Sequence, residues 1–431
     1  MNDSVFMERR RLEQLTPQQL ASHQIERLNH LLSTILPQNQ FYNEKLGSLK
    51  LPLESLEQLS SLPFTYKEEL GRSSHETRAA ANLTYPYERY VRFHRTSGTR
   101  GRPLVVLDTT EDWQWWINTW QYVLDTADLG ADDRAMLAFS FGPFIGFWSA
   151  FDDAIARGCL VIPGGGMTSV ARLDLLASSR ATVLFCTPSY ALYLANVANE
   201  NQIDVASLDV SRLIVAGEPG GSLPEVRDRI ERIWDAKVID HSGASEVGPW
   251  GYAAPDGGGL YVNEAEFIAE FLSVESGKSA VEGELSELVL TTLGRDGCPV
   301  IRYRTRDLVR PTWTATGPCK FVLLKGGVLG RVDDMMIIRG VNIFPSSVEQ
   351  ILHSFPEVVE YRMTARTNGE MDNLTVEVED RLADADRIAK ELHLRLGLKV
   401  DVDCVPLGSL PRFEGKGMRF IDERQSTRAP D

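Results

Sequence analysis

The segment RTSGTRGRP, from Arg95 to Pro103, places glycines, hydroxyl side chains and arginines together in one short stretch. Backbone N–H groups in such a loop can converge on an anion, and hydroxyl and guanidinium groups can complete a phosphate cage. The Walker pattern, G-x-x-x-x-G-K followed by Ser or Thr, is absent from the chain. A polar turn between two strands would have the same composition. The loop alone therefore indicates either a phosphate site or a turn.

The overall charge limits the partners that such a loop could serve. The chain has 431 residues and a formal net charge of -15 at pH 7. A nucleic-acid partner needs a basic surface that displaces counterions, so this charge argues against one. A nucleotide is still allowed, because a few local cations and backbone N–H groups can hold its phosphates. The length predicts two or more domains.

Cysteine usage and apolar runs indicate the cellular setting. The five cysteines are scattered, and none forms a C-x-x-C pair, so neither a disulfide framework nor a zinc ribbon is indicated. Residues 1–12 lack the apolar segment of a signal peptide. No run of about 18 apolar residues occurs, so no membrane span is expected. We expect a reduced, cytoplasmic protein.

The loop needs two strands to hold it, and short apolar runs on either side predict them at Tyr90–Phe93 and Leu104–Leu107. Further runs predict buried parallel strands at Cys159–Ile162, Thr182–Cys186, Leu213–Ala216 and Lys237–Ile239. A helix over Pro224–Trp234 separates the last two, and this order predicts βαβ units and a mixed sheet. After residue 258, alternating runs at Phe267–Phe271 and Glu287–Thr291 predict antiparallel strands.

The Gly-rich segment KGGVLGR, Lys325 to Arg331, is the candidate domain boundary. Beyond it, the patterns predict a small α+β unit with two helices and three strands. These are helix Ser346–Ser354, strands Val358–Thr364 and Asn373–Val378, helix Ala383–Leu394 and strand Lys399–Val405.

Six further strings follow the loop in a consistent order. They are CTPSYAL from Cys186, AGEP from Ala216, SGASEVGP from Ser242, IRYRTRDL from Ile301, GRVDDMMIIRGVNIFPSSVE from Gly330, and PRFEGKGMRFIDER from Pro411. Together with RTSGTRGRP they resemble the adenylate-forming superfamily, and the whole chain is similar to its phenylacetate–CoA ligase branch. One such string is weak evidence, but six in register are strong.

This resemblance implies an α/β fold and a two-step reaction. A large N-terminal domain, residues 1–329, would contain mixed βαβ sheets and a β-barrel-like subdomain, and residues 330–431 would form a small mobile α+β lid. The enzyme would use ATP and Mg²⁺ to convert a carboxylic acid, phenylacetate-like or benzoate-like, into acyl-AMP with release of pyrophosphate. The acyl group would then pass to coenzyme A. A homodimer is a candidate assembly.

Two alternatives stay open. The acyl group could pass instead to a carrier-protein thiol or an amine, since all of the adenylation residues would be shared. A degenerate member that only binds nucleotide or acyl-AMP would be the non-enzymatic alternative.

The resemblance also assigns roles to individual residues. Lys416 is similar to the lysine that bridges carboxylate and α-phosphate, Glu246 to the Mg²⁺ ligand, Asp307 to the acceptor for both ribose hydroxyls, and Asp333 to the hinge residue. Thr96 joins Lys416 and Glu246 as a catalytic candidate. The nucleotide-binding candidates are Ser97, Gly98, Thr99, Gly101, Gly217, Glu218, Pro219, Asp240, His241, Ser242, Gly243, Asp307 and Arg331. Taken without the resemblance, Glu246 and Lys416 would each be read as an ordinary exposed charge.

The aromatic stretch FSFGPFIGFW is similar to one wall of the family's acyl pocket. Its candidates are Phe139, Phe141 and Phe144, and Ala216 and Gly243 complete the predicted pocket. Flat aromatic walls suit an aryl acid through offset or edge-to-face contacts. Packing in the core is the alternative for each phenylalanine.

The chain departs from the family pattern at Ser242, where relatives have an aromatic residue that stacks on adenine. A stacked base contributes roughly 1–3 kcal/mol. Either His241 or another aromatic compensates, or nucleotide affinity is lower. The segment WGYAAPDGGGLYV, from Trp250, has no cysteine or histidine. We therefore predict no structural zinc, because a lone His241 cannot supply four ligands.

Overall fold

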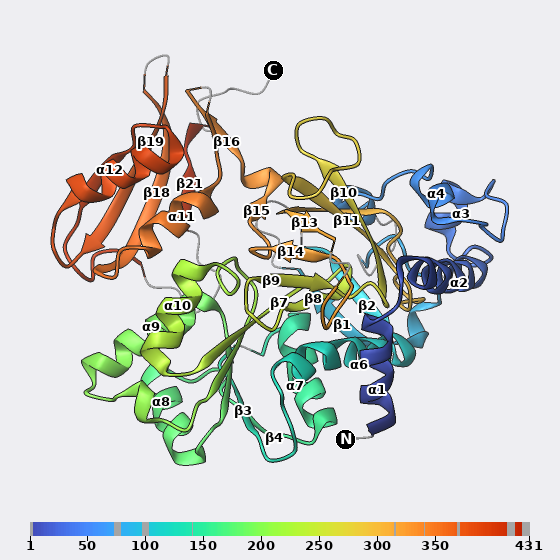
Figure 1. The fold of residues 1–431 in the computed structure, drawn as a ribbon, viewed down its shortest axis with the longest axis horizontal. Coiled ribbons are helices and arrows are strands. Elements are labelled where there is room, and N and C mark those ends of the chain that lie inside the picture. Colours follow the sequence, from blue (N-terminus) through green and yellow to red (C-terminus); the bar gives the residue numbers. More distant parts are fainter. Residues whose placement is uncertain are drawn as a thin grey trace.

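The computed structural model describes residues 3–72, 79–96, 103–139, 141–313, 316–339, 341–368, 371–411 and 419–424 (Figure 1). Most of the predicted phosphate loop and the predicted catalytic lysine therefore lie outside the described residues. These are Ser97, Gly98, Thr99, Gly101 and Lys416. Within the described residues, no helix is both long and apolar enough to cross a membrane.

A nine-stranded mixed sheet forms the centre of the molecule, in the order β13-β14-β9-β8-β7-β6-β5-β3-β4 (Figure 1). Five strands are parallel: β3 (Arg134–Leu137), β4 (Leu160–Pro163), β5 (Val183–Cys186), β6 (Arg212–Val215) and β7 (Lys237–Ala244). The rest continue antiparallel from β7: β8 (Gly248–Ala253), β9 (Gly259–Val262), β14 (Leu323–Lys325) and β13 (Pro311–Thr312). The predicted βαβ order and mixed sheet are confirmed.

Helices cover both faces of the parallel strands, which explains why the central residues of those strands are apolar on both faces rather than alternating. On one face, Phe185 of β5 shares a core with Trp120. On the other, Cys186 shares a core with Trp234. The first face carries α6 (Thr110–Thr126) and α7 (Ile145–Arg157), and the second carries α8 (Ser169–Ser179), α9 (Pro188–Glu200) and α10 (Pro224–Trp234).

A hairpin and a second sheet stand beside the central one. The hairpin pairs β1 (Tyr90–Arg95) with β2 (Val105–Thr109), so the Gly-rich loop does connect two strands as predicted. The second sheet is antiparallel and has the order β10 (Phe267–Ser273), β11 (Ser286–Thr292), β12 (Tyr303–Val309) and β15 (Gly330–Arg331). It contains both of the antiparallel strands predicted after residue 258.

Five N-terminal helices precede the hairpin: α1 (Asp3–Glu13), α2 (Pro17–Ile35), α3 (Gln40–Leu46), α4 (Leu56–Ser60) and α5 (Lys67–Leu70). Thr16 caps α2, because its side-chain oxygen accepts a hydrogen bond from the Gln19 N–H. In return, the side-chain oxygen of Gln19 accepts a hydrogen bond from the Thr16 N–H. The apolar stripe of α2, including Leu28, packs against Ile268 of the second sheet.

The C-terminal residues have a hydrophobic core of their own, drawn from residues between Met336 and Val400. Figure 1 shows this part, in orange and red, set to one side of the central sheet. Its elements are β16 (Met336–Ile338), β17 (Val341–Ile343), α11 (Pro345–His353), β18 (Val358–Asn368), β19 (Met371–Asp380), α12 (Ala385–Leu396), β20 (Asp401–Cys404) and β21 (Phe420–Asp422). The two predicted helices and three predicted strands are confirmed. The boundary at residue 329 stays a prediction, and Gly330 still pairs with β12.

Candidate functional site

Thr96 closes the base of the Gly-rich loop. Its N–H donates to the Leu104 carbonyl at 3.0 Å, and its Oγ1 accepts from the Leu104 N–H at 3.0 Å. The side chain is buried. One residue earlier, the Arg95 N–H donates to the Pro143 carbonyl at 2.6 Å. The loop therefore leaves the hairpin from a fixed point that is tied to the aromatic stretch 139–148.

The second group of predicted residues lies at the carboxyl edge of the parallel sheet. Cys186, Val215 and Asp240 are in register across β5, β6 and β7, so the segments that follow these strands meet at one edge. This edge is where open α/β sheets bind ligands. Four predicted residues form the turn after β6, namely Ala216, Gly217, Glu218 and Pro219. Gly217 has φ +94°, a conformation that favours glycine.

Asp240 is held rigidly beneath this turn. Its Oδ2 accepts from Ser222 Oγ at 2.5 Å and its Oδ1 from the His241 N–H at 2.9 Å. Burial raises the pKa of Asp240 to about 7, against the effect of these two hydrogen bonds. A Cβ on Gly221 would lie 2.6 Å from the Asp240 carboxyl carbon, so the turn fits closely over the carboxyl group.

Glu246 lies in the turn between β7 and β8 and is buried. Its Oε1 is 2.6 Å from the Lys67 ammonium and 3.1 Å from the Tyr303 hydroxyl, which donates to it. Burial alone would raise the pKa of Glu246, but the charge and hydrogen bond of Lys67, together with a backbone hydrogen bond and that of Tyr303, outweigh burial and hold the pKa below its usual range. Glu246 is therefore ionised at neutral pH, as a cation ligand must be.

Asp307 and Arg331 face each other across β12 and β15, with Nη1 and Oδ1 3.5 Å apart. Burial opposes the charge on Arg331, but Asp307, Asp333 and Glu246 are near enough to raise its pKa above the usual value. Asp333 lies in a 3₁₀ turn, Val332–Asp334, directly after β15. One arginine therefore lies within ion-pair distance of both the predicted ribose carboxylate and the predicted hinge residue.

The donor chemistry at Glu246 fits a magnesium ion that arrives with a nucleotide. Mg²⁺ is usually held by one or two carboxylates together with substrate phosphates, rather than by an all-protein cage. In the part of the chain that the structure describes, no group of three or more His, Cys, Asp or Glu side chains could hold a metal ion. A single ionised carboxylate meets the first of these requirements.

The three predicted pocket phenylalanines lie in two groups of ring contacts and are not equally exposed. Phe139 stacks on Phe147 with ring centroids 4.5 Å apart, and Phe141 meets Trp148 edge-on at 5.2 Å. Phe144 is the most exposed of the three, at 38%. Phe139 and Phe141 are half-buried and Phe144 is exposed, so their assignment to an acyl pocket stays a prediction.

His241 does not take over the position of the aromatic residue that is missing at Ser242. Its Nδ1 lies 2.8 Å from the Gly251 carbonyl, and its ring centroid is 4.2 Å from that of Trp120. Burial lowers its pKa to about 4, so the ring is neutral. Successive residues of a strand point to opposite faces, so the buried His241 ring lies on the other face from Ser242. Gly243, the next residue, is exposed.

Comparison with known proteins places this geometry in a family. A sequence model of the AMP-binding enzyme C-terminal domain matches residues 340–424. The chain is 31% identical over 425 residues to a phenylacetate–coenzyme A ligase of Pseudomonas putida, covering 94% of each protein. It is 30% identical to the ligase of the same name from Thermus thermophilus, covering 95% of this chain and 98% of the relative.

The chain belongs to the phenylacetate–coenzyme A ligase family. Membership makes it an AMP-forming acid–thiol ligase and confirms the superfamily and branch that the sequence strings predicted. The roles predicted for individual residues stay predictions.

Solved structures agree with this placement in the phenylacetate–coenzyme A ligase family. A 2-hydroxyisobutyryl-CoA ligase in the postadenylation state, in complex with an acyl-AMP, matches with a TM-score of 0.86 and 25% identity over 93% of this chain and 89% of that chain. The same ligase in its thioesterification state matches with a TM-score of 0.72. The chain as a whole is therefore more similar to the postadenylation structure than to the thioesterification structure.

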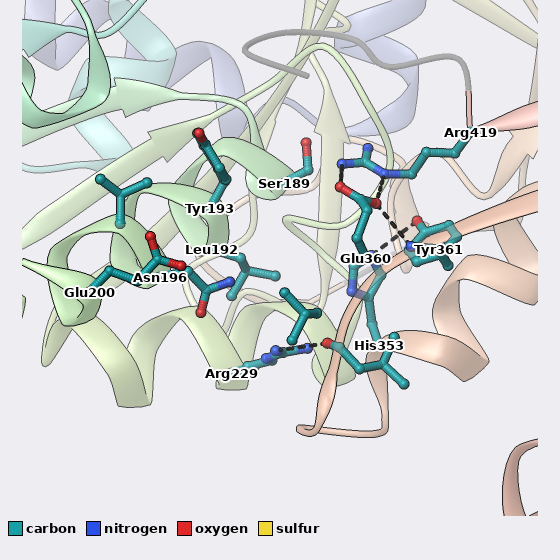
Figure 2. Close-up of a pocket in the computed structure, with 13 residues that line it drawn as sticks. Ser189, Leu192, Tyr193, Asn196, Glu200, Arg229, His353, Glu360, Tyr361 and Arg419 are labelled. Atoms are coloured by element: carbon teal, nitrogen blue, oxygen red, sulfur yellow. Dashed lines mark hydrogen bonds and ion pairs between the residues drawn. The ribbon is translucent and has the colours of Figure 1, made fainter. Parts of the chain in front are cut away.

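A small cavity lies between α9 and the C-terminal residues (Figure 2). Its volume is about 60 Å³. Small-molecule sites occupy about 300–1,000 Å³, so it is not the acid pocket of a family member. Ser189 lies on its rim, and the Ser189 N–H donates to the predicted nucleotide residue Glu218 at 2.6 Å. The sheet edge that carries the predicted nucleotide residues therefore adjoins the contact between α9 and the C-terminal residues.

Three residues at the site were missed by the sequence analysis. Lys67 lies in a polar segment far from every family string, and only the fold reveals its partner. Tyr303 lies inside the string IRYRTRDL, but its contact with Glu246 depends on register. Arg295 is fully buried with Asp108 and donates to the Ser245 carbonyl at 2.8 Å, which fixes the turn that carries Glu246.

Proposed function

We propose that this family member activates an aryl carboxylic acid with ATP and transfers the acyl group to coenzyme A. The observation that carries the proposal is that strand β12 links two predicted site residues: its Asp307 lies 3.5 Å from Arg331, and the hydroxyl of its Tyr303 donates to Glu246 at 3.1 Å. The strand therefore holds the predicted ribose acceptor near the predicted phosphate-side carboxylate. The carboxyl edge of the sheet and the base of the Gly-rich loop supply the remaining nucleotide contacts.

In the first step, a carboxylate oxygen of the acid attacks the α-phosphorus of ATP, and the bond to the β-phosphate oxygen breaks to release pyrophosphate. Asp307 accepts hydrogen bonds from the ribose, and Arg331 approaches ribose and phosphate. Magnesium held by Glu246 neutralises phosphate charge when it is bound. Lys416, which lies outside the described residues, is the proposed bridge between the carboxylate and the α-phosphate. Positioning and charge neutralisation are all that this chemistry asks of the protein.

In the second step, the sulfur of coenzyme A attacks the acyl carbon. The bond from that carbon to the AMP oxygen breaks, and the thiol proton passes to solvent. We assign residues 1–329 to the body of the enzyme and residues 330–431 to a lid that turns about Asp333 between the two steps. The separate hydrophobic core of the C-terminal residues supports this division.

An aryl acid is proposed because of the aromatic wall. Phe139 and Phe141 present half-buried rings, and Phe144 presents an exposed one. Aromatic pairs favour offset or edge-to-face contacts, which a planar acid can make with these rings. Ala216 and Gly243, both without bulk, border the sheet edge and leave room for the carboxylate.

Acid-dependent exchange of labelled pyrophosphate into ATP, measured over a library of aryl and alkyl acids, tests the first step. We expect exchange with one or more planar aryl acids and its loss in Lys416→Ala, since that residue would touch the reacting groups. Absence of exchange across the library would overturn the proposal. Product analysis with coenzyme A, a holo-carrier protein or an amine then identifies the acceptor. Transfer only to the carrier or the amine would overturn the second step.

A further inference from the structure

The ammonium of Lys67 lies against the carboxylate that is proposed to hold magnesium. Nζ of Lys67 is 2.6 Å from Oε1 of Glu246. The Glu246 side chain is 7% exposed, whereas that of Lys67 is 42% exposed. The lysine therefore reaches the carboxylate from the open side, where a ligand must also approach.

The backbone that carries Lys67 is fixed to the strand that carries the ribose acceptor. Thr65 pairs with Tyr303 of β12 in a parallel bridge. The Thr65 N–H donates to the Arg302 carbonyl at 2.9 Å, and its carbonyl accepts from the Arg304 N–H at 3.0 Å. Buried Thr65 also donates through Oγ1 to the Ile301 carbonyl at 2.7 Å. Lys67 is thus held at the site by the fold and does not arrive there by chance.

Nucleotide binding competes with this pair in two ways, because the phosphates attract the ammonium and a metal ion that arrives with them would attract the carboxylate. Two cations at one carboxylate oxygen repel each other, so Oε1 of Glu246 cannot serve a metal ion and the ammonium equally. A lysine has four rotatable methylenes and can move its charge while its backbone stays in place. The nearest new anions would be the phosphates that approach Glu246.

We propose that Lys67 is a phosphate-binding residue that pairs with Glu246 in the free enzyme and with a β- or γ-phosphate oxygen of bound ATP. This inference rests on the proposed function, because Glu246 marks the phosphate side of the site. It adds a cation from the N-terminal helical region to the nucleotide site.

Calorimetric titration of Lys67→Met with ATP and with AMP, in EDTA and without acid, separates phosphate binding from a structural role. AMP lacks the β- and γ-phosphates, so only ATP should lose affinity. We expect the dissociation constant for ATP to rise about tenfold, as for a lost hydrogen bond to a charged group, while that for AMP is unchanged. Equal ATP affinity in wild type and variant would overturn the proposal. An equal loss for ATP and AMP would also overturn it, since that would show damage to the whole site.

Four further variants complete the experiment. Lys67→Arg keeps a cation and should retain most of the ATP affinity; if Lys67→Met does not fold, comparison with Lys67→Gln gives the same decision. Lys45→Met is the matched control, because Lys45 pairs with Glu69 in the same region at 2.7 Å and away from Glu246. Glu246→Gln, titrated with ATP and Mg²⁺, tests the metal role separately. The EDTA titration needs no metal. Failure of the phosphate role of Lys67 is therefore distinguishable from failure of the metal role of Glu246.

Discussion

At the scale of single residues, the site contains two buried carboxyl groups whose pKa values are shifted in opposite directions. Glu246 has a cation beside it and stays ionised. Asp240 accepts hydrogen bonds from Ser222 and from the His241 N–H, and burial raises its pKa to about 7. The first carboxylate can hold a cation, and the second serves as a hydrogen-bonded brace under the turn after β6.

Asp240 should leave a signature in the pH dependence of stability. An aspartate in an unfolded chain has a pKa of about 3.9. Because the folded pKa is higher, the folded state holds the proton more tightly, and the free energy of unfolding falls as pH rises from about 4 to about 7. Asp240→Asn removes this fall. Urea unfolding at pH 5 and pH 8 should show the variant gaining on the order of 2 kcal/mol relative to wild type at the higher pH. Parallel pH profiles would contradict this.

At the scale of elements, close approach between neighbouring segments positions the site. The turn after β6 lies so near β7 that Gly221 has no room for a side chain. On the far side of the site, the parallel bridge between Thr65 and β12 positions the start of α5. Strand edges and tight turns, rather than long helices, therefore set the spacing of the nucleotide candidates.

Gly221→Ala should lower both stability and ATP affinity. Its Cβ would meet the Asp240 carboxyl group and the Val215 side chain at 2.6 Å, so backbone or side chain must shift. Such overpacking costs about 1–3 kcal/mol. Gly146→Ala is the matched control, because a Cβ there meets nothing within 4 Å. Thermal unfolding and ATP titration of both variants test the idea, and equal losses in the two would contradict it.

At the scale of the whole molecule, α10 forms a contact surface for the C-terminal residues. Glu225 of α10 accepts from Gln350 Nε2 at 3.0 Å and is 3.5 Å from Arg395. Arg229 donates to the Pro356 carbonyl at 3.3 Å, beside the cavity of Figure 2. These contacts stabilise the arrangement that resembles the postadenylation state.

Removing the contacts between α10 and the C-terminal residues should change the populations of the domain arrangements. It should unfold neither the N-terminal nor the C-terminal residues. In the double variant Glu225→Ala, Arg229→Ala, each lost contact is worth about 0.2–1 kcal/mol, enough for a several-fold change in population. Faster hydrogen exchange in α11 and a larger radius of gyration in solution scattering are the expected results. Asp228→Ala, which changes an exposed residue of the same helix, is the control. Identical exchange in the double variant and in wild type would contradict the prediction.

Sequence patterns were informative wherever a local signal existed. The limits of α10 matched the prediction. Pairings between distant segments gave no such signal. Lys67 with Glu246 depends on a strand register that no local pattern encodes. The buried orientation of His241 depends on Trp120, which lies on a helix of another segment. The motifs therefore indicated which residues matter, and the fold was needed to show which of them meet.

The bridge between Thr65 and Tyr303 also has a consequence for biosynthesis. The two partners are separated by more than half of the chain, so the N-terminal helices must wait for β10 to β12 to be translated. At about 5–20 residues per second, that interval lasts roughly ten to fifty seconds. During it, the apolar stripe of α2 has not yet met Ile268 and the rest of its cluster. A ribosome-bound intermediate with this stripe uncovered is a natural client for chaperones, and completion of β12 is the event that would release it.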